Sequence, residues 1–190
     1  MLKYKLKEMS ACNEAIGWVG DRTPEQAWNE CERGDWMLWI AQKKDVDLRK
    51  LTLAKARCSK LAIHLMKDER SRKAVEVAER FGLGLATIEE LDEARNAAAD
   101  ADADADAYAA AGAAAYADYA DAAAYAASAA AVYAAAGAAA YAADAYAADA
   151  YAADAGAAAA RKNILKQCAD ICREILSDEI MEESCHTHPE

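Results

Sequence analysis

The chain has 190 residues, enough for one domain with a buried core, and 55% of them are hydrophobic. Its net charge is −11, and residues 97–160 supply nine of these charges through nine aspartates, with no lysine, arginine or glutamate. This imbalance argues against nucleic acid as a partner, since phosphates are bound by clusters of lysine and arginine. Because aspartates also interrupt the long alanine-rich stretch, we expect no transmembrane helix, and the charged N-terminal residues predict no secretory leader.

The first third of the chain predicts a series of helices with clear end signals. Residues 3–19 are expected to form one helix that ends near Gly20. Thr23 can cap the next helix, with Pro24 in its first position and Gln26 closing a capping box. We expect that helix to run to about residue 33, with Gly34 as its left-handed stop and Asp35 as the cap of the following helix.

Amphipathic segments continue along the rest of the chain. Residues 47–65 place apolar side chains at spacings of three and four, opposite a solvated face rich in lysine and arginine. Residues 68–81 repeat this pattern and are followed by Gly82 and Gly84 as terminators. A second capping box at Thr87 opens a helix that leads into the alanine-rich tract, and residues 164–176 form one more apolar stripe. No segment shows the alternation typical of strands.

The tract at residues 97–160 contains 42 alanines, nine aspartates and eight tyrosines, without proline. Because alanine has the highest helix propensity, we expect folded helix here, not a disordered linker. A single helix of this length would span about 95 Å, so the tract must fold back. The candidate break points are Gly112, Gly137 and Gly156, although a glycine surrounded by alanine can equally mark a close helix crossing.

The two ends of this tract differ in how they distribute aromatic and acidic side chains. The tyrosines between residues 108 and 121 fall within an arc of about 80°, and Asp118 and Asp121 lie well away from that arc. Residues 141–154 repeat every five positions, which winds tyrosine and aspartate around the helix. The segment at 108–121 is therefore the better candidate for a directional binding surface.

These patterns predict an all-α fold, a multi-helix bundle with close-packed Ala/Tyr/Asp-rich helices. We expect a single all-helical domain over residues 1–190. Its parts are a Trp/Leu-rich helical half at 1–96, the Ala/Tyr/Asp helical tract at 97–160, a C-terminal amphipathic helix at 161–184 and a tail at 185–190.

Residues with chemical potential are better explained by packing. Cys168 and Cys172 share the apolar stripe of the last helix, where burial in the core is favoured over a metal site. His64 has no nucleophile nearby in sequence, so we expect a structural role. The tail at 185–190 offers a cysteine and two histidines, for which a frayed terminus is favoured over metal binding. We predict no catalytic residue, no metal, no cofactor and six reduced cysteines.

The four tryptophans lie within the first 40 residues and are expected to form a small core against the helix at 47–65. An exposed indole would instead be a strong anchor for a partner. Solvated aspartates and the aromatic face of the tract are the other candidates for partner contact. The predicted partner-binding residues are Asp100, Asp104, Asp118, Asp121, Asp144, Asp149, Asp154, Tyr108, Tyr116, Tyr119, Trp36 and Trp39.

Several motifs occur together in an order that resembles a known family. Residues 27–39 read AWNECERGDWMLW, residues 48–51 LRKL and residues 71–74 SRKA, and the Ala/Tyr/Asp tract follows. From about residue 11 to 176, the chain resembles the fifth numbered family of immunity proteins of bacterial polymorphic toxin systems. The resemblance implies an all-helical fold and immunity, and it supplies no catalytic residues. Similar sequences also occur in bacteriophages.

The leading functional hypothesis is a cytoplasmic, non-enzymatic inhibitor that neutralises a basic toxin or effector protein, with a nuclease as one candidate, through acidic and aromatic helix faces. The alternative is a phage counter-defence protein that blocks a host immune enzyme or sequesters a small-molecule or nucleotide signal. For the latter, the arginines outside the tract could build an anion site: Arg22, Arg33, Arg49, Arg57, Arg70 and Arg72. A purely structural or ice-binding bundle ranks lower.

Overall fold

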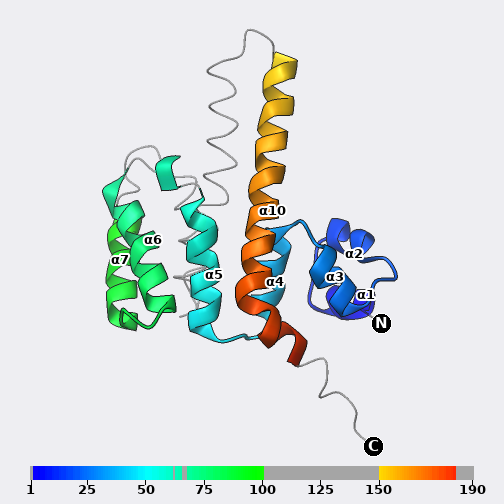
Figure 1. Cartoon of the computed structure of the whole chain (residues 1–190), viewed down its shortest axis with the longest axis horizontal. Coiled ribbons are helices and arrows are strands. Elements are labelled where there is room, and N and C mark those ends of the chain that lie inside the picture. Colours follow the sequence, from blue (N-terminus) through cyan, green and yellow to red (C-terminus); the bar gives the residue numbers. More distant parts are fainter. Residues whose placement is uncertain (1, 62, 66–67, 101–149, 183–190) are drawn as a thin grey trace, which may run out of the picture.

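Figure 1 shows the computed structural model, which describes residues 2–61, 63–65, 68–100 and 150–182. Throughout these residues the secondary structure is helical, without strands, and helices pack on helices, so the predicted all-α bundle is confirmed. The elements are α1 (Leu2–Glu8), α2 (Asn13–Val19), α3 (Pro24–Glu30), α4 (Gly34–Lys43), α5 (Leu48–Lys60), the 3₁₀ turn η1 (Ile63–Leu65), α6 (Glu69–Gly82), α7 (Ile88–Asp100) and α10 (Ala150–Glu182).

The N-terminal segment forms two short helices, so the prediction of one helix over residues 3–19 was wrong. Ser10 adopts a left-handed conformation with φ of 63° after α1. The Ser10 amide donates to the Lys7 carbonyl at 3.0 Å, and the Ala11 amide donates to the Leu6 carbonyl at 2.9 Å. These two bonds form a Schellman motif, which satisfies the last carbonyls of α1 and turns the chain toward α2. Because glycine usually occupies this position, the sequence shows little sign of the turn.

The capping box at the start of α3 is confirmed. The Thr23 hydroxyl accepts from the Gln26 amide at 3.1 Å, and the Gln26 side chain accepts from the Thr23 amide at 2.9 Å. The end of α3 was predicted wrongly, because the helix stops at Glu30 and Gly34 begins α4. Asp35 accordingly lies in the first turn of α4 and is not its cap.

The role of Gly34 is to allow close contact between α4 and α10. A Cβ atom built on Gly34 would lie 2.3 Å from the Cβ of Cys168 and 2.7 Å from the backbone nitrogen of Ala169. Gly82 plays the same part where α6 meets α5, since its Cβ would lie 2.6 Å from that of Leu53. Both glycines were predicted as helix terminators. Gly82 does end α6, but Gly84, with φ of 76°, supplies the left-handed turn.

The starts of α5, α6 and α7 agree with the sequence. Asp47 caps α5 by accepting from the Lys50 amide, and Asp68 caps α6 by accepting from the Arg70 amide. The Thr87 capping box is also formed, because its hydroxyl accepts from the Glu90 amide at 3.2 Å while the Glu90 carboxylate accepts from the Thr87 amide. Each of these signals lies within four residues of the helix it starts.

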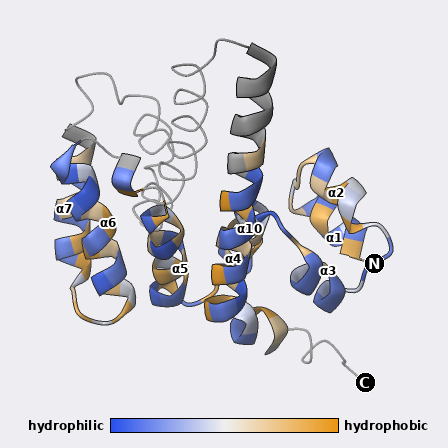
Figure 2. Ribbon diagram, turned by 45° about the horizontal axis from the view of Figure 1, so that its top comes forward, coloured by the Kyte–Doolittle hydropathy of each residue, from blue (hydrophilic) through white to orange (hydrophobic). Residues whose placement is uncertain are grey.

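The helix α10 lies at the centre of the described fold, with α4 and α5 against it, α6 and α7 beyond α5, and α1–α3 on the other side (Figure 1). Its small side chains Cys168, Ala169 and Cys172 have no exposed surface. They share one core with residues of α4 and α5, whereas Phe81 and Leu91 belong to a second core between α5, α6 and α7. Hydrophilic and hydrophobic residues are interspersed along α6 and α7, as expected of amphipathic helices (Figure 2).

The face of α5 predicted to be solvated is in part buried. Lys55 is only 1% exposed, and its ammonium donates to the Gln42 side chain at 3.3 Å. The periodicity of residues 47–65 therefore identified the helix but not its surroundings. It also overestimated the length, because α5 ends at Lys60 and η1 follows.

The structure describes both ends of the alanine-rich tract as helix. As predicted, the helix that starts after Thr87 leads into the tract, because α7 continues to Asp100. The C-terminal helix starts earlier than predicted, because α10 begins at Ala150 and runs without interruption through Gly156 and past residue 160. Gly156 is therefore not a break point. The other two predicted break points, Gly112 and Gly137, lie outside the described residues, as do the predicted helices of residues 101–149. None of the helices in the described ranges is long and apolar enough to cross a membrane.

Candidate binding site

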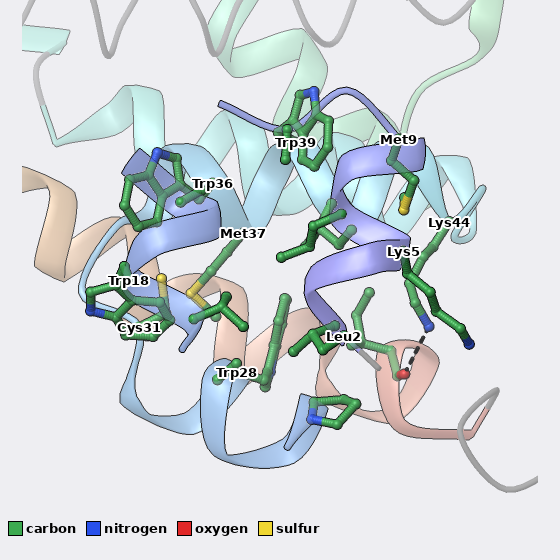
Figure 3. A pocket seen from close by; sticks show the side chains of 18 of the residues that line it. Leu2, Lys5, Met9, Trp18, Trp28, Cys31, Trp36, Met37, Trp39 and Lys44 are labelled. Atoms are coloured by element: carbon green, nitrogen blue, oxygen red, sulfur yellow. Dashed lines mark hydrogen bonds between the residues drawn. The ribbon is translucent and has the colours of Figure 1, made fainter. Parts of the chain in front are cut away.

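A cavity of about 660 Å³ lies between α1, α2 and α3 on one side and α4 and α10 on the other (Figure 3). Its lining is mainly apolar and includes all four tryptophans of the chain, Trp18, Trp28, Trp36 and Trp39. This volume falls in the range of pockets that enclose small organic molecules, about 300–1,000 Å³. The cavity is therefore a candidate binding site.

Two tryptophans, each in contact with an arginine, line one end of this cavity. The rings of Trp18 and Trp36 meet edge to face, with centroids 6.0 Å apart. The guanidinium of Arg22 lies 4.5 Å from the Trp18 ring centroid, and that of Arg33 lies 4.2 Å from the Trp36 ring centroid. These cation–π contacts hold both indoles in fixed orientations.

Asp35 keeps Arg33 in place and is itself neutralised by it. The Arg33 guanidinium donates to both carboxylate oxygens of Asp35, at 2.9 and 2.7 Å, and this hydrogen bonding raises the pKa of Arg33. Asp35 is the only acidic side chain among the described residues that line the cavity. Because a bidentate arginine holds it, its charge contributes little to the cavity.

The opposite end of the cavity is cationic. Lys5 of α1 and Lys44, which follows α4, both line the cavity and lie together on the side away from Trp18 and Trp36 (Figure 3). The Lys44 ammonium donates to the Ile180 carbonyl of α10 at 3.4 Å, which holds it near the last turn of that helix. The cavity therefore has an aromatic end and a basic end, joined by apolar side chains.

Trp28 lies on the floor of the cavity and connects α3 to α10. It is 5% exposed, and its indole nitrogen donates to the Ser177 hydroxyl at 3.0 Å. Arg173 of α10 donates to the carbonyls of Trp28 and Cys31, at 3.3 and 2.8 Å. The tryptophans were predicted to pack against the helix at 47–65. That helix does contribute to the same core, but α10 makes the direct contacts to Trp28.

Two thiols also line the cavity, and they differ in exposure. Cys12 is exposed, whereas Cys31 is buried, and this burial raises the pKa of the Cys31 thiol. Its sulfur is in contact with the backbone of Arg33. The groups that converge on the cavity thus provide apolar contact, aromatic faces and positive charge, which are the properties of a binding site.

The structure places only part of the predicted partner-binding set. Trp36 and Trp39 lie on α4, half-buried, where both line the cavity. Asp100 is the last residue of α7, and Asp154 lies in α10. The other predicted partner-binding residues lie outside the described residues: Asp104, Tyr108, Tyr116, Asp118, Tyr119, Asp121, Asp144 and Asp149.

Sequence reasoning missed the cavity, because its lining comes from five helices between residues 2 and 181. The crowding of four tryptophans in the first 40 residues was the one signal that pointed to it. The sequence did not single out Lys5 or Lys44, because nothing in their sequence neighbourhoods indicates that the fold places them beside the same cavity.

Other groups singled out in the sequence do not form sites. Cys58, Cys168 and Cys172 are buried and free, as expected for core cysteines. Contact with Cys168 lowers the pKa of Cys58, but contact with Cys172 and burial together raise it, and contact with Cys58 and burial raise the pKa of Cys168. Among the described residues no group of three or more metal-binding side chains is present. His64, predicted to be structural, is exposed in η1.

The six arginines proposed as an anion site are dispersed over several helices. Arg57 pairs with Glu174, Arg70 with Asp68, and Arg72 with Glu69. The other three are engaged as well: Arg22 with Glu30, Arg33 with Asp35 and Arg49 with the carbonyl of Phe81. Each of the six guanidinium groups is thus engaged by a carboxylate or a carbonyl of the chain itself.

Comparison of the chain with protein-family models, with curated proteins and with solved structures finds no match. The resemblance to immunity proteins therefore rests on the sequence motifs quoted above and stays a prediction.

Proposed function

We propose that this protein is a non-enzymatic, cytoplasmic inhibitor that binds and neutralises a toxin or effector protein, in the manner of an immunity protein. The observation that carries the proposal is the separation of charge along the chain, because residues 97–160 hold nine of the eleven net negative charges. A basic protein is the expected partner. A nuclease is the leading candidate, since its phosphate-binding cleft is basic and an acidic protein surface can occupy it.

Ion pairs between the described helices support this division of charge. Lys50 pairs with Glu179 at 2.6 Å, Arg57 with Glu174 at 3.0 Å, and Lys60 with Glu79 at 2.6 Å. Such pairs join α5 to α10 and to α6, so the charged residues of the helical frame largely offset one another. The surplus of negative charge belongs to residues 97–160, which extend from the last residues of α7 to the first part of α10.

The position of α10 also favours this proposal. Its N-terminal part extends beyond α4 and α5 (Figure 1). This projecting part contains Asp154, the last aspartate of the tract. Among the described residues, the C-terminal end of the tract thus lies on the part of α10 that extends past α4 and α5.

The test measures association with the partner, first isolated by affinity capture from the native host and then purified. One variant replaces five tract aspartates by asparagine: Asp118, Asp121, Asp144, Asp149 and Asp154. A matched control, the frame variant, removes five exposed carboxylates that lie outside residues 97–160: Glu8→Gln, Asp21→Asn, Asp45→Asn, Glu76→Gln and Glu93→Gln.

We expect the tract variant to slow association by about tenfold or more at low salt, because electrostatic steering acts mainly on the association rate. The frame variant, with the same change in net charge, should change the rate by no more than about twofold. Equal rates for the tract variant and the unmodified protein would rule out acidic capture.

A second candidate function, sequestration of a small molecule as a counter-defence protein, is favoured by the cavity beside the tryptophans. Mass spectrometry of molecules released by heating the freshly purified protein tests it. A stoichiometric ligand that is lost when Ala27→Phe narrows the cavity supports this function. If the protein purified from its native host releases no ligand, this function is wrong.

A further inference from the structure

We infer that the tryptophan cavity is a binding site for an amphipathic anion, a molecule with a largely apolar body and one compact negative head group. The inference goes beyond inhibition of a protein partner, and it specifies the ligand chemistry of the cavity on which the second candidate function rests. It rests on the shape of the cavity, on its apolar lining and on the position of its charges.

The apolar lining accounts for the body of the ligand. Apart from the tryptophans, the cavity is lined by leucine, isoleucine and methionine side chains such as Leu2, Leu6, Met9, Ile40 and Met181. Methionine is flexible and polarizable, so it adapts to acyl chains and to aromatic rings alike. Burying apolar ligand surface against this lining supplies most of the affinity.

The charges of the cavity account for the head group. Lys5 and Lys44 lie on the same side, as Figure 3 shows, and the acidic residue of the lining, Asp35, is held by Arg33 at the aromatic end. A carboxylate or sulfonate placed between the two ammonium groups would make charge-assisted hydrogen bonds. A cation or a neutral molecule would gain nothing from this end of the cavity.

The wall opposite the lysines sets the orientation. Arg22 stacks on the Trp18 ring and Arg33 stacks on the Trp36 ring, and these contacts fix the orientation of the two indoles. The apolar body is therefore expected to point toward the tryptophans and the head group toward Lys5 and Lys44. Because all four tryptophans line the cavity, intrinsic fluorescence reports directly on its occupation.

The experiment titrates the full-length protein with four probes below their micelle concentrations, followed by tryptophan fluorescence and calorimetry. Dodecanoate carries an acyl body and an anionic head, and dodecanol has the same chain without charge. Dodecyltrimethylammonium reverses the charge, and anilinonaphthalene sulfonate replaces the acyl chain by aromatic rings. The two anions distinguish an acyl from an aromatic ligand.

We expect one anion to bind with a stoichiometry of one, at least about tenfold more tightly than dodecanol and dodecyltrimethylammonium, because a hydrogen-bonded charge adds about one order of magnitude or more to the affinity. Lys5→Gln combined with Lys44→Gln should remove this preference while the binding of dodecanol stays the same. The matched control combines Lys7→Gln with Lys43→Gln, exposed lysines of α1 and α4 that do not line the cavity. It should bind like the unmodified protein.

Ala27→Phe fills part of the cavity without adding an indole, and it should weaken the binding of that anion while the circular dichroism spectrum stays unchanged. The proposal is wrong if neither anion binds more tightly than dodecanol, or if the Lys5 and Lys44 variant keeps its preference for the anion. It is also wrong if anions bind only after removal of residues 183–190, since the end of the chain would then be the natural occupant.

Discussion

Gly34→Ala tests the contact on which the centre of this fold depends. The added Cβ would lie 2.3 Å from the Cys168 Cβ, 2.7 Å from the Ala169 nitrogen and 2.7 Å from the Cys168 carbonyl carbon. Two of these three atoms belong to the backbone of α10, so no side-chain rotation relieves the overlap. The two helices must separate, which loosens the core that they share.

The cost of such overpacking in a core is typically about 1–3 kcal/mol. Because backbone atoms form the obstacle, we expect a value near the upper end, about 3 kcal/mol. Gly34 is the first residue of α4, so the higher helix propensity of alanine offsets little of this loss. With a urea m-value of about 2 kcal/mol/M, the unfolding midpoint should fall by about 1.5 M.

Gly17→Ala provides the matched control. Gly17 lies inside α2, and nothing comes within 4 Å of a Cβ built there. Alanine should therefore stabilise the protein by about 0.5–1 kcal/mol, as it generally does in the interior of a helix. The same substitution thus has opposite effects at two helical positions, and urea unfolding followed by circular dichroism measures both.

Gly34→Asn separates this explanation from that of a left-handed helix stop. A left-handed stop accepts asparagine more readily than alanine, whereas a close helix contact rejects the larger side chain more strongly. We expect the asparagine variant to be at least as unstable as the alanine variant. Unfolding midpoints equal to that of the unmodified protein, or an asparagine variant more stable than the alanine variant, would refute the contact between α4 and α10.

Three further predictions concern the described helices. Ser177→Ala leaves the buried Trp28 indole nitrogen without its acceptor and should cost about 1–3 kcal/mol in urea unfolding; a loss below about 0.5 kcal/mol would contradict the hydrogen bond. In a Cys185→Ser background, Cys12 alone should react rapidly with an aromatic disulfide reagent, because the other four thiols are buried; a second fast thiol would contradict their burial. The Lys50 ammonium lowers the pKa of Glu179 from its usual 4.5, so their pairing stabilises the folded protein above pH 4.5 and is lost as the pH falls further. Lys50→Met should therefore reduce the fall in the free energy of unfolding between about pH 5 and about pH 3. An unchanged fall would contradict the pairing.

Helix starts were predictable because their signals are local. The hydroxyl of Thr23 and the side chain of Gln26 are three residues apart and determine the first turn of α3 whatever lies around it. The same holds for the capping box of Thr87 and Glu90 at the start of α7. The apolar stripe at residues 164–176 likewise predicted a buried helix face, since a periodic stripe needs a partner surface.

Helix ends and contacts between helices were less predictable, because they depend on residues far away in sequence. Ser10 turns the chain in a position where glycine is usual, so no sequence signal marked the end of α1. Gly34 has the composition of a terminator, but its contact is with Cys168, 134 positions later in the chain. Lys55 belongs to a face rich in basic residues and is nevertheless buried.

By itself, the sequence determined the helical class, most helix starts and the concentration of negative charge in residues 97–160, because propensity, capping and charge are properties of short segments. Tertiary structure alone decided how closely α4 approaches α10, which lysines lie together and that all four tryptophans surround one cavity. The physical reason is that a cavity and a close helix contact exist only between elements. Lys5 and Lys44 lie 39 positions apart in the chain, with α2, α3 and α4 between them, and only the tertiary fold places both at the edge of one cavity.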